Sequence, residues 1–250
     1  NILGIEYLKA INQYKLPLQP YIITRKEAQH HDQTISGEIA SATAIRNFLT
    51  SPTTNLASIS KVIPSTSQTI IENLLQHSPA IPSVENLAQQ LFYFLRTATS
   101  LTLQDIPYIS EGLEHKLHKA AGTATTIEQL LSNVKSKRYP LTRLKRILIH
   151  CLLQTSKKDF HNFNTIGPQY ARILAFDDTG RDLIKTSKKT ATIPLISKPT
   201  KFINSNDIFQ HQLSPLQKML AIDIKATDIY NLSQNKPSGA DFVTNPLYCT

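Results

Sequence analysis

The stretch Thr34-Ile-Ser-Gly-Glu-Ile-Ala-Ser-Ala-Thr-Ala-Ile-Arg46 carries the most information about the fold of this chain. Small hydroxyl residues follow an apolar lead, and Arg46 lies one turn into an expected helix from about Ala42 to Leu49. Such a helix start offers a phosphate backbone N–H groups, hydroxyl donors and a fixed positive charge. The pattern also fits an ordinary helix start with Ser41 or Thr43 as N-cap and a solvated Arg46. Both interpretations are open at this point.

The segments before this stretch indicate an α/β arrangement. Apolar residues at helical spacing predict a helix over residues 1–13, and Tyr21-Ile-Ile-Thr24 is a short β-type run that ends at Arg25. Helix, strand, loop and helix is the order of an α/β domain, where ligands bind beyond the carboxyl ends of the strands. The chain enters its first helix without a Met or a lead-in, so we expect an α/β remnant rather than a whole domain.

Breaker residues in Ser51-Pro52-Thr-Thr-Asn55 predict a domain boundary. We expect the remnant in residues 1–52 and a mainly α-helical domain in residues 53–250. Helical spacing of apolar residues predicts helices at 67–77, 84–97, 110–121, 126–134 and 141–154. We expect Gly122 to end the third of these helices and Asp177-Asp-Thr-Gly180 to form a turn. Pro194 argues against a central strand at 192–196.

The charge of the chain is high and uneven. The formal net charge is +9, and residues 135–201 contain fifteen Lys or Arg against four Asp or Glu. This asymmetry favours a polyanionic partner bound at one face, although a merely solvated surface is the alternative. No apolar run has the length of a membrane span, and two cysteines cannot form a disulfide framework. We expect a cytoplasmic protein with no membrane partner.

The densest basic cluster runs from Lys137 and Arg138 through Tyr139 to Arg143 and Arg146. On the expected helix, the leucines share one face. Arg143 and Arg146 lie on the opposite face. A helix docked on a core and touching phosphates has this pattern, and Tyr139 could stack on an unpaired base of single-stranded RNA. The alternative is an exposed basic helix without a partner.

Other polar groups give weaker signals. Glu111 and Glu114 stand at an expected helix start, where the helix dipole favours acids, so capping is preferred over acid–base catalysis. His115 is expected on the surface. His30-His31-Asp32 has metal-binding residue types but no third partner at a fixed spacing, so we assign no metal site. No Ser/His/Asp or Cys/His arrangement is present in the local sequence, and the catalytic residues stay unknown.

Five segments taken together resemble one family, the bacterial tRNA(Met) cytidine acetate ligases. The segments that carry the resemblance lie in order along the chain: Asn1-Ile-Leu-Gly-Ile-Glu-Tyr-Leu-Lys9, Ile39-Ala-Ser-Ala-Thr-Ala-Ile-Arg46, Glu111-Gly-Leu-Glu114, Lys137-Arg-Tyr139 with Thr142-Arg143, and Ile229-Tyr-Asn-Leu232. The resemblance implies the end of a Rossmann-like nucleotidyltransferase domain followed by a helical domain that helps to hold tRNA. It implies activation of acetate by ATP as acetyl-adenylate, and acetyl transfer to N4 of the wobble cytidine of elongator tRNA(Met).

The resemblance also suggests roles for individual residues. Asn1 and Arg25 match positions that contact ATP in the family, and Ser41, Thr43 and Arg46 lie in the segment that holds phosphates in related nucleotidyltransferases. A magnesium ion is expected with the ATP. Lys137, Arg138, Tyr139, Arg143 and Arg146 are the expected tRNA-binding residues. The oligomeric state is not indicated.

Some features depart from the family pattern. The His-x-x-His-type motif for adenylyl transfer is absent. We therefore expect residues 1–250 alone to have no catalytic turnover. A usual pair of hydroxyl residues is Ala40-Ser41 here, and His115-Lys116 replaces Asn-Arg. Two other functions are open: a nucleotidyltransferase acting on a small phosphate substrate, and a non-catalytic RNA-binding module.

Overall fold

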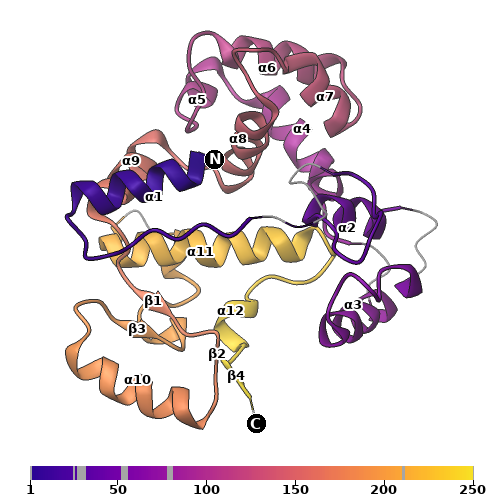
Figure 1. Cartoon of the computed structure of the whole chain (residues 1–250). Coiled ribbons are helices and arrows are strands. Elements are labelled where there is room, and N and C mark those ends of the chain that lie inside the picture. The colour runs from indigo at the N-terminus through magenta and orange to yellow at the C-terminus, as the bar shows by residue number, and fades with distance from the viewer. Residues whose placement is uncertain are drawn as a thin grey trace. The chain divides into compact units, whose positions relative to one another are not determined.

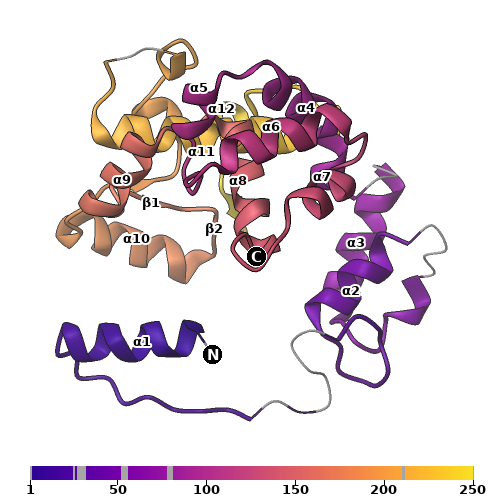
Figure 2. The same ribbon diagram turned by 90° about the horizontal axis from the view of Figure 1, so that it is seen from above.

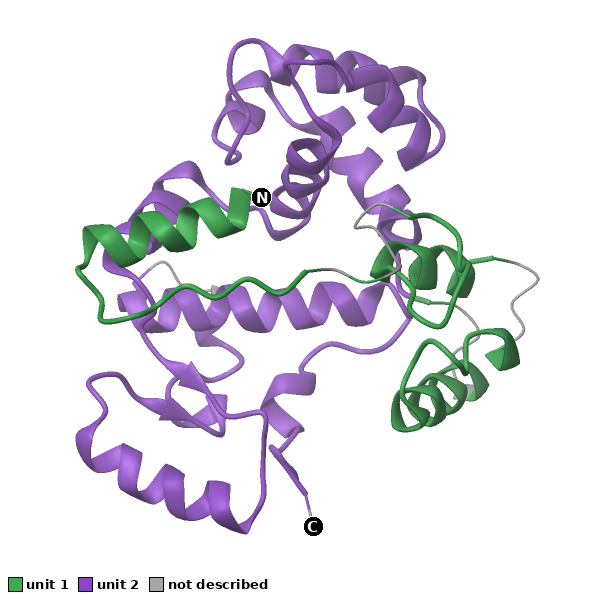
Figure 3. Cartoon of the chain, in the orientation of Figure 1, with its two compact units in different colours: residues 1–81 green, residues 82–250 purple. Residues whose placement is uncertain are grey.

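The structure is a computed structural model that describes residues 2–24, 26, 32–51, 56–77, 81–209 and 212–249. The chain divides into two compact units, Asn1–Ile81 and Pro82–Thr250 (Figure 3). The division falls later in the chain than residue 52, and residues 52–55 lie outside the described part. The domain boundary that we expect at residue 52 therefore stays a prediction.

Unit 1 contains helices joined by long irregular segments (Figure 1). Its elements are α1 (Ile2–Gln13), α2 (Ala42–Leu49), the 3₁₀ helix η1 (Leu56–Ser58) and α3 (Ser65–His77). The helices predicted at 1–13, 42–49 and 67–77 are confirmed. Helix α1 has apolar residues at helical spacing, but none of them is buried. Ile2 is 80% exposed and Leu3 is 65% exposed.

The strand predicted at Tyr21–Thr24 is wrong. These residues are in no strand, and the side chains of Tyr21, Ile22 and Ile23 are 85–90% exposed. A β-type run becomes a strand only when a neighbouring strand accepts its backbone hydrogen bonds, and the described part of unit 1 supplies none. The described residues of unit 1 therefore form helices and irregular segments, without a strand.

Unit 2 is mostly helical, and its first half is a bundle. The elements of this half are η2 (Val84–Leu87), α4 (Ala88–Thr97), α5 (Ser100–Gln104), α6 (Leu113–Thr123), α7 (Ile127–Val134), α8 (Leu141–Leu153) and α9 (Lys157–Ile166). Helix α4 packs against α6 and α8, and α7 packs against α6 and α8 (Figure 2). The four helices predicted between residues 84 and 154 are present, but the first is divided into η2 and α4. Helix α6 begins at Leu113 rather than at residue 110 and runs past Gly122 to Thr123.

The bundle has the larger hydrophobic core of the chain. Side chains with no more than 2% exposure come from every major helix: Leu91 and Leu95 of α4, Leu113 and Leu117 of α6, Leu130 of α7, and Leu144, Ile147 and Leu148 of α8. Cys151 is part of this core, and burial raises the pKa of its thiol to about 12. Its thiol is therefore inert.

The second half of unit 2 forms a smaller core around one long helix. Its elements are β1 (Ala171–Arg172), β2 (Ala175–Phe176), α10 (Asp178–Thr190), β3 (Leu195–Ile196), η3 (Pro199–Lys201), η4 (Asp207–Phe209), α11 (Pro215–Leu232), α12 (Ala240–Val243) and β4 (Leu247–Tyr248). Strand β1 pairs in parallel with β3, and β2 pairs in parallel with β4. Ile196, Ile203, Leu220 and Ile224 are the centre of this core.

A partly buried ionic network fastens β1 to the two C-terminal helices. Arg172 donates to Asp223 of α11 at 2.9 Å and to Asp241 of α12. Burial of the guanidinium opposes its charge, but the hydrogen bonds to Asp241 and Asp223 outweigh this effect and raise the pKa of Arg172. The hydroxyl of Tyr170 donates to Asp223 at 3.4 Å. The network holds the start of the paired strands against α11.

The turn predicted at Asp177–Gly180 is instead the start of α10. The Asp177 carboxylate accepts a hydrogen bond from the Gly180 backbone N–H at 2.7 Å, so it is the N-cap of this helix.

In the described part of the chain, no helix is long and apolar enough to cross a membrane.

Candidate functional site

The start of α2 has the geometry of a capped helix. The Ser41 hydroxyl accepts a hydrogen bond from the Ala44 N–H at 3.0 Å and donates to the Asp32 carbonyl at 2.5 Å. Ser41 is 7% exposed, and both functions of its hydroxyl are used. The N-cap interpretation of Ser41 is therefore confirmed, and Thr43 is not the cap.

Arg46 and Thr43 face the same side of α2 because they are three residues apart. Arg46 is exposed and Thr43 is half-buried. A phosphate at this helix start would therefore meet the guanidinium and backbone N–H groups rather than the Ser41 hydroxyl. Asn1 and Arg25, as well as His30 and His31, lie outside the described residues.

In unit 2, the loop between α5 and α6 has an unusual backbone. Tyr108 has φ +67° and Glu111 has φ +61°, and Gly112 follows with φ +81°. Left-handed conformations are costly for residues with a Cβ, so side chains from elsewhere must hold this loop in place. We call residues 108–112 the left-handed loop.

Cationic and hydroxyl donors collect on the carbonyls of the left-handed loop. Arg143 of α8 donates to the Tyr108 carbonyl through Nε at 3.1 Å and through Nη2 at 2.6 Å. Its Nη2 also donates to the Ser110 hydroxyl at 2.9 Å. Lys157 donates to the Ile109 carbonyl at 2.7 Å. The basic residues of this region thus stabilise the backbone, since charge-assisted hydrogen bonds are the strong ones.

The stacking role predicted for Tyr139 is wrong. Its side chain is 7% exposed, and its hydroxyl donates to the Glu111 carbonyl at 3.2 Å. The cations of Lys116, Arg138 and Arg143 lie 5.5–5.9 Å from the ring centroid. No ring face is free for a base, so Tyr139 supports the surrounding cations instead. We call Glu111, Lys116, Arg138, Tyr139 and Arg143 the Tyr139 cluster.

The predicted tRNA-binding residues differ in whether their charged groups already have partners within the protein. Arg138 pairs with Glu111 at 2.5 Å, with 61% and 54% of the two side chains exposed. Lys137 is exposed, and its side chain makes no hydrogen bond or ion pair with the residues that the structure describes. Arg146 is exposed, and its guanidinium lies 4.9 Å from the centroid of the Tyr108 ring. Lys137 and Arg146 are therefore the members most available to an external phosphate.

Glu114 is a buried carboxylate at the start of α6. It is 5% exposed, and its Oε1 accepts a hydrogen bond from Gln104 at 3.0 Å, whereas its Oε2 is buried without a partner. A hydrogen bond from its own backbone N–H, followed by that from Gln104, lowers the pKa of Glu114. Glu114 lies in the first turn of α6 as predicted, but the N-cap is Gly112, which makes no side-chain capping bond. Glu111 precedes the helix, so the helix start predicted at this residue is wrong. His115 is exposed as predicted.

Sequence reasoning missed two groups of cations. Lys116 donates to the Val134 carbonyl at 2.8 Å within the Tyr139 cluster. Lys188, Lys198 and Lys201 line a pocket in the second half of unit 2. The surplus of positive charge over residues 135–201 indicated that this region holds unpaired cations. It could not show that Lys188, Lys198 and Lys201 lie around one pocket.

The chain has relatives among proteins of known name. It is 35% identical over 249 residues to the tRNA(Met) cytidine acetate ligase of Thermoanaerobacter sp. (strain X514). The match covers 99% of this chain and 58% of the relative. It is 34% identical to the ligase of the same name from Acetivibrio thermocellus, covering 98% of this chain and 59% of the relative. The chain thus spans less than two thirds of the length of these relatives.

Solved structures match over the same extent. The apo crystal structure of Thermotoga maritima TmcAL has a TM-score of 0.86 and 26% identity, covering 99% of this chain and 59% of that protein. The same protein bound with alpha-thio ATP has a TM-score of 0.82 and 25% identity, covering 99% and 58%. A model of the HIGH nucleotidyl transferase family matches residues 1–242, and the chain belongs to that family.

Proposed function

We propose that this protein is an ATP-dependent ligase that acetylates N4 of the wobble cytidine of elongator tRNA(Met). The observation that carries the proposal is the likeness to tRNA(Met) cytidine acetate ligases, 35% identity over 99% of this chain. The proposed partners are acetate and elongator tRNA(Met), and the proposed location is the cytoplasm.

The proposed chemistry has two steps. A carboxylate oxygen of acetate attacks the α-phosphorus of ATP, pyrophosphate leaves, and acetyl-adenylate forms. The exocyclic amine of the cytidine then attacks the acetyl carbon, and AMP leaves as the amine loses a proton. Neither step needs a covalent protein nucleophile, because positioning and neutralisation of phosphate charge supply most of the catalysis.

For ATP, we propose Asn1, Arg25, Ser41, Thr43 and Arg46 as the contact region. The backbone N–H groups at the start of α2 and the exposed guanidinium of Arg46 would meet phosphate oxygens. Ser41 acts indirectly, because its hydroxyl already caps the helix. The magnesium ion is proposed to travel with the phosphates of ATP, which is its usual mode of binding in such sites. No group of three metal-ligating side chains occurs among the described residues.

For tRNA, we propose that the Tyr139 cluster with Lys137 and Arg146 is one contact surface. Lys137 and Arg146 would contact phosphates directly, since both are exposed. Arg138 and Arg143 are already bound within the protein and would hold the left-handed loop in its shape. This division of labour supports recognition by shape and charge, which is common for folded RNA.

The test is acetate transfer by the protein expressed from its complete reading frame. Radiolabelled acetate, ATP and elongator tRNA(Met) should give acid-precipitable label in the tRNA and N4-acetylcytidine after nuclease digestion. Absence of label with folded protein and intact tRNA would contradict the proposal. A matched initiator tRNA serves as the specificity control.

The two other functions give different results in simple binding tests. A nucleotidyltransferase for a small phosphate substrate would bind ATP but not tRNA in a gel shift. An RNA-binding module would bind tRNA but give no heat with a non-hydrolysable ATP analogue in calorimetry. The proposed ligase gives both signals.

A further inference from the structure

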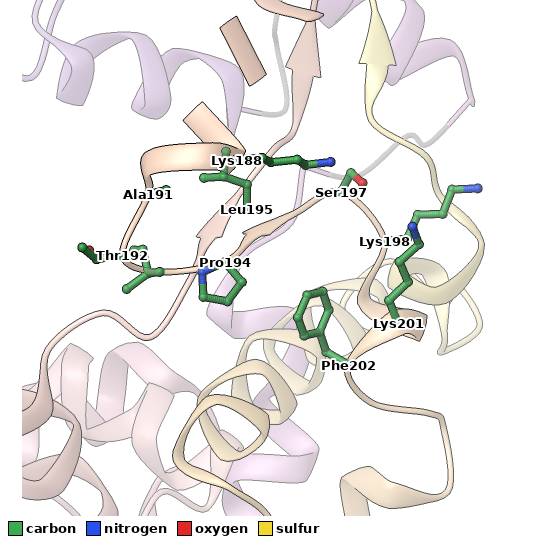
Figure 4. A pocket seen from close by; sticks show the side chains of 10 residues that line it. Lys188, Ala191, Thr192, Pro194, Leu195, Ser197, Lys198, Lys201 and Phe202 are labelled. Atoms are coloured by element: carbon green, nitrogen blue, oxygen red, sulfur yellow. The ribbon is translucent and has the colours of Figure 1, made fainter. Parts of the chain in front are cut away.

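A pocket of about 400 Å³ lies between the end of α10 and the segment that follows it (Figure 4). Three lysines line it together with hydroxyl and apolar residues, among them Lys188, Lys198, Lys201, Pro194, Ser197 and Phe202. No acidic residue is among them. We call this the lysine pocket.

The three lysines of the pocket are free cations. Lys188, Lys198 and Lys201 are exposed, and none takes part in an ion pair or a side-chain hydrogen bond of the described residues. Two other cations of α10 are neutralised, since Arg181 pairs with Asp178 and Lys185 with Asp182. Like charges that share a pocket repel each other, and a bound anion removes that repulsion.

Two separate elements bring the lysines together. Lys188 is in the last turn of α10, whereas Lys198 is the N-cap of η3 and Lys201 is its last residue. A lysine near a helix C-terminus has a local explanation in the helix dipole. That explanation covers Lys188 only, and it does not account for two further lysines from another segment.

The scaffold under the lysines is fixed. Ile196 of β3 is fully buried in the second core, and Pro199 at the start of η3 is buried. Strand β3 is paired with β1, which the Arg172 network anchors to α11 and α12. The pocket is therefore a built feature of the fold, and its lysines extend from anchored backbone.

The rest of the lining suits a nucleotide. Pro194, Leu195 and Phe202 are half-buried, so they offer apolar surface to a sugar or a base. Figure 4 shows the Lys188 side chain extending toward Ser197, with Lys198 and Lys201 on the side of Phe202. Cations around an apolar floor are typical of surfaces that bind single strands, where aromatic groups meet bases and lysines meet phosphates.

We propose that the lysine pocket is a second RNA contact site, which binds the phosphodiester backbone of an unpaired tRNA segment at a distance from the Tyr139 cluster. The proposal rests on the proposed function for the identity of the RNA. Lys188, Lys198 and Lys201 contact phosphates, the Ser197 hydroxyl donates to a phosphate oxygen, and the floor formed by Pro194 and Phe202 contacts a sugar or base.

The test measures the salt dependence of tRNA binding by the full-length protein. Fluorescence anisotropy with labelled elongator tRNA(Met) is recorded between 0.1 M and 1 M monovalent salt for the wild type and K188A/K198A/K201A. Each lost contact to a single strand lowers the slope of log K against log salt by about 0.7, so the triple variant should lose about 2. At 0.1 M salt this amounts to roughly 100-fold weaker binding.

The matched control is K61A/K119A/K236A, which removes the same charge from exposed lysines outside the pocket. A finer pair is Lys188→Ala against Lys189→Ala, adjacent exposed lysines of which only Lys188 lines the pocket. The inference predicts a larger loss of slope for K188A/K198A/K201A than for its control, with unchanged melting temperatures. Equal slopes for the two triple variants would overturn it.

Further outcomes distinguish RNA from free ATP as the ligand of the pocket. They also distinguish failure of this inference from failure of the proposed function. Weakened ATP binding in calorimetry, with tRNA binding intact, would assign the pocket to a free nucleotide and overturn the inference. If the wild type acetylates tRNA but the triple variant behaves as its control, this inference alone fails. If the wild type neither binds nor acetylates tRNA, the proposed function fails as well.

Discussion

The two basic regions of unit 2 use their cations in opposite ways. In the Tyr139 cluster, Arg143 and Lys116 donate to backbone carbonyls, and Arg138 is paired with Glu111. In the lysine pocket, the side chains of Lys188, Lys198 and Lys201 make no hydrogen bond or ion pair with a described residue. Positive charge along a sequence therefore does not by itself mark a ligand surface. Substitutions should separate the regions, because the first should lose stability and the second should lose only RNA affinity.

The largest effect should come from the scaffold beneath the lysine pocket. Arg172→Met leaves Asp241, which is 8% exposed, as a buried carboxylate without its partner. Breaking a buried pair on one side costs about 4 kcal/mol, so the free energy of unfolding should fall by that amount. Urea denaturation measures it. Arg181→Met, which breaks the exposed pair with Asp178, is the control and should cost about 0.3 kcal/mol. A loss below about 1 kcal/mol for Arg172→Met would contradict the role of the network.

The next effect tests the Tyr139 cluster. Arg143→Ala removes three hydrogen bonds from the left-handed loop, two to the Tyr108 carbonyl and one to Ser110. Charge-assisted bonds of this kind are worth about 1.5–3 kcal/mol, so we expect a loss of about 3 kcal/mol in denaturant unfolding. Lys145→Ala on the same helix is the control, because Lys145 is exposed. Weakened tRNA binding with full stability would instead make Arg143 a direct RNA contact.

A smaller effect should follow Tyr139→Phe, which removes one neutral hydrogen bond and keeps the ring between its cations. Loss of the bond to the Glu111 carbonyl should cost about 1 kcal/mol of unfolding free energy. Tyr93→Phe is the matched control, since Tyr93 is 73% exposed. If the ring stacked on a base, Tyr139→Phe would keep both stability and affinity. Equal stability of the two variants would therefore revive the stacking interpretation.

The smallest effect is a pH dependence within the bundle. His150 packs against Tyr108 and Phe160 with centroid distances of 5.6 Å and 5.2 Å, and its Nδ1 is buried without a partner. Burial, followed by the charge of Arg146, lowers the pKa of His150 below 6.5. The neutral imidazole is favoured in the folded state, so its stabilisation is complete above pH 6.5 and is lost as the pH falls through the lowered pKa.

Denaturant unfolding at pH 7.5 and pH 5.5 measures this dependence. His150→Gln should flatten the fall in stability between the two values, whereas His161→Gln, at an exposed position, should leave it unchanged. The same profile for the wild type and His150→Gln would assign the dependence to another group.

The helices of the bundle could be predicted because each has one apolar face and clear ends. Helix α8, for example, has Leu144, Ile147 and Leu148 on its buried side, and α7 has the N-cap Thr126. Helix α11 was not predicted, because apolar residues lie all around it and both cores of unit 2 contact it. Its capping box, Ser214 with Gln217 after Pro215 at the first turn, was the signal that could have located its start.

The contacts of the candidate site could not be predicted, because they join distant parts of the chain. Tyr139 reads as an exposed residue of a basic segment, but its partner Glu111 lies 28 residues earlier. Arg143 likewise reaches the Tyr108 carbonyl over 35 residues. The positive φ of Tyr108 and Glu111 that exposes these carbonyls has no sequence signature, since neither residue is Gly or Asn. Local patterns thus located the basic helix but not the use of its charges.

Helix α11 contacts α8 of the bundle and also supplies Leu220 and Ile224 to the second core. Its 18 residues form a stiff rod of about 27 Å. Because both halves of unit 2 are built on this rod, it acts as a spacer between the Tyr139 cluster and the lysine pocket. Under the proposed function, an RNA that touches both regions would meet two sets of cations held by one rigid helix, so the protein would set the separation of the phosphates that it contacts.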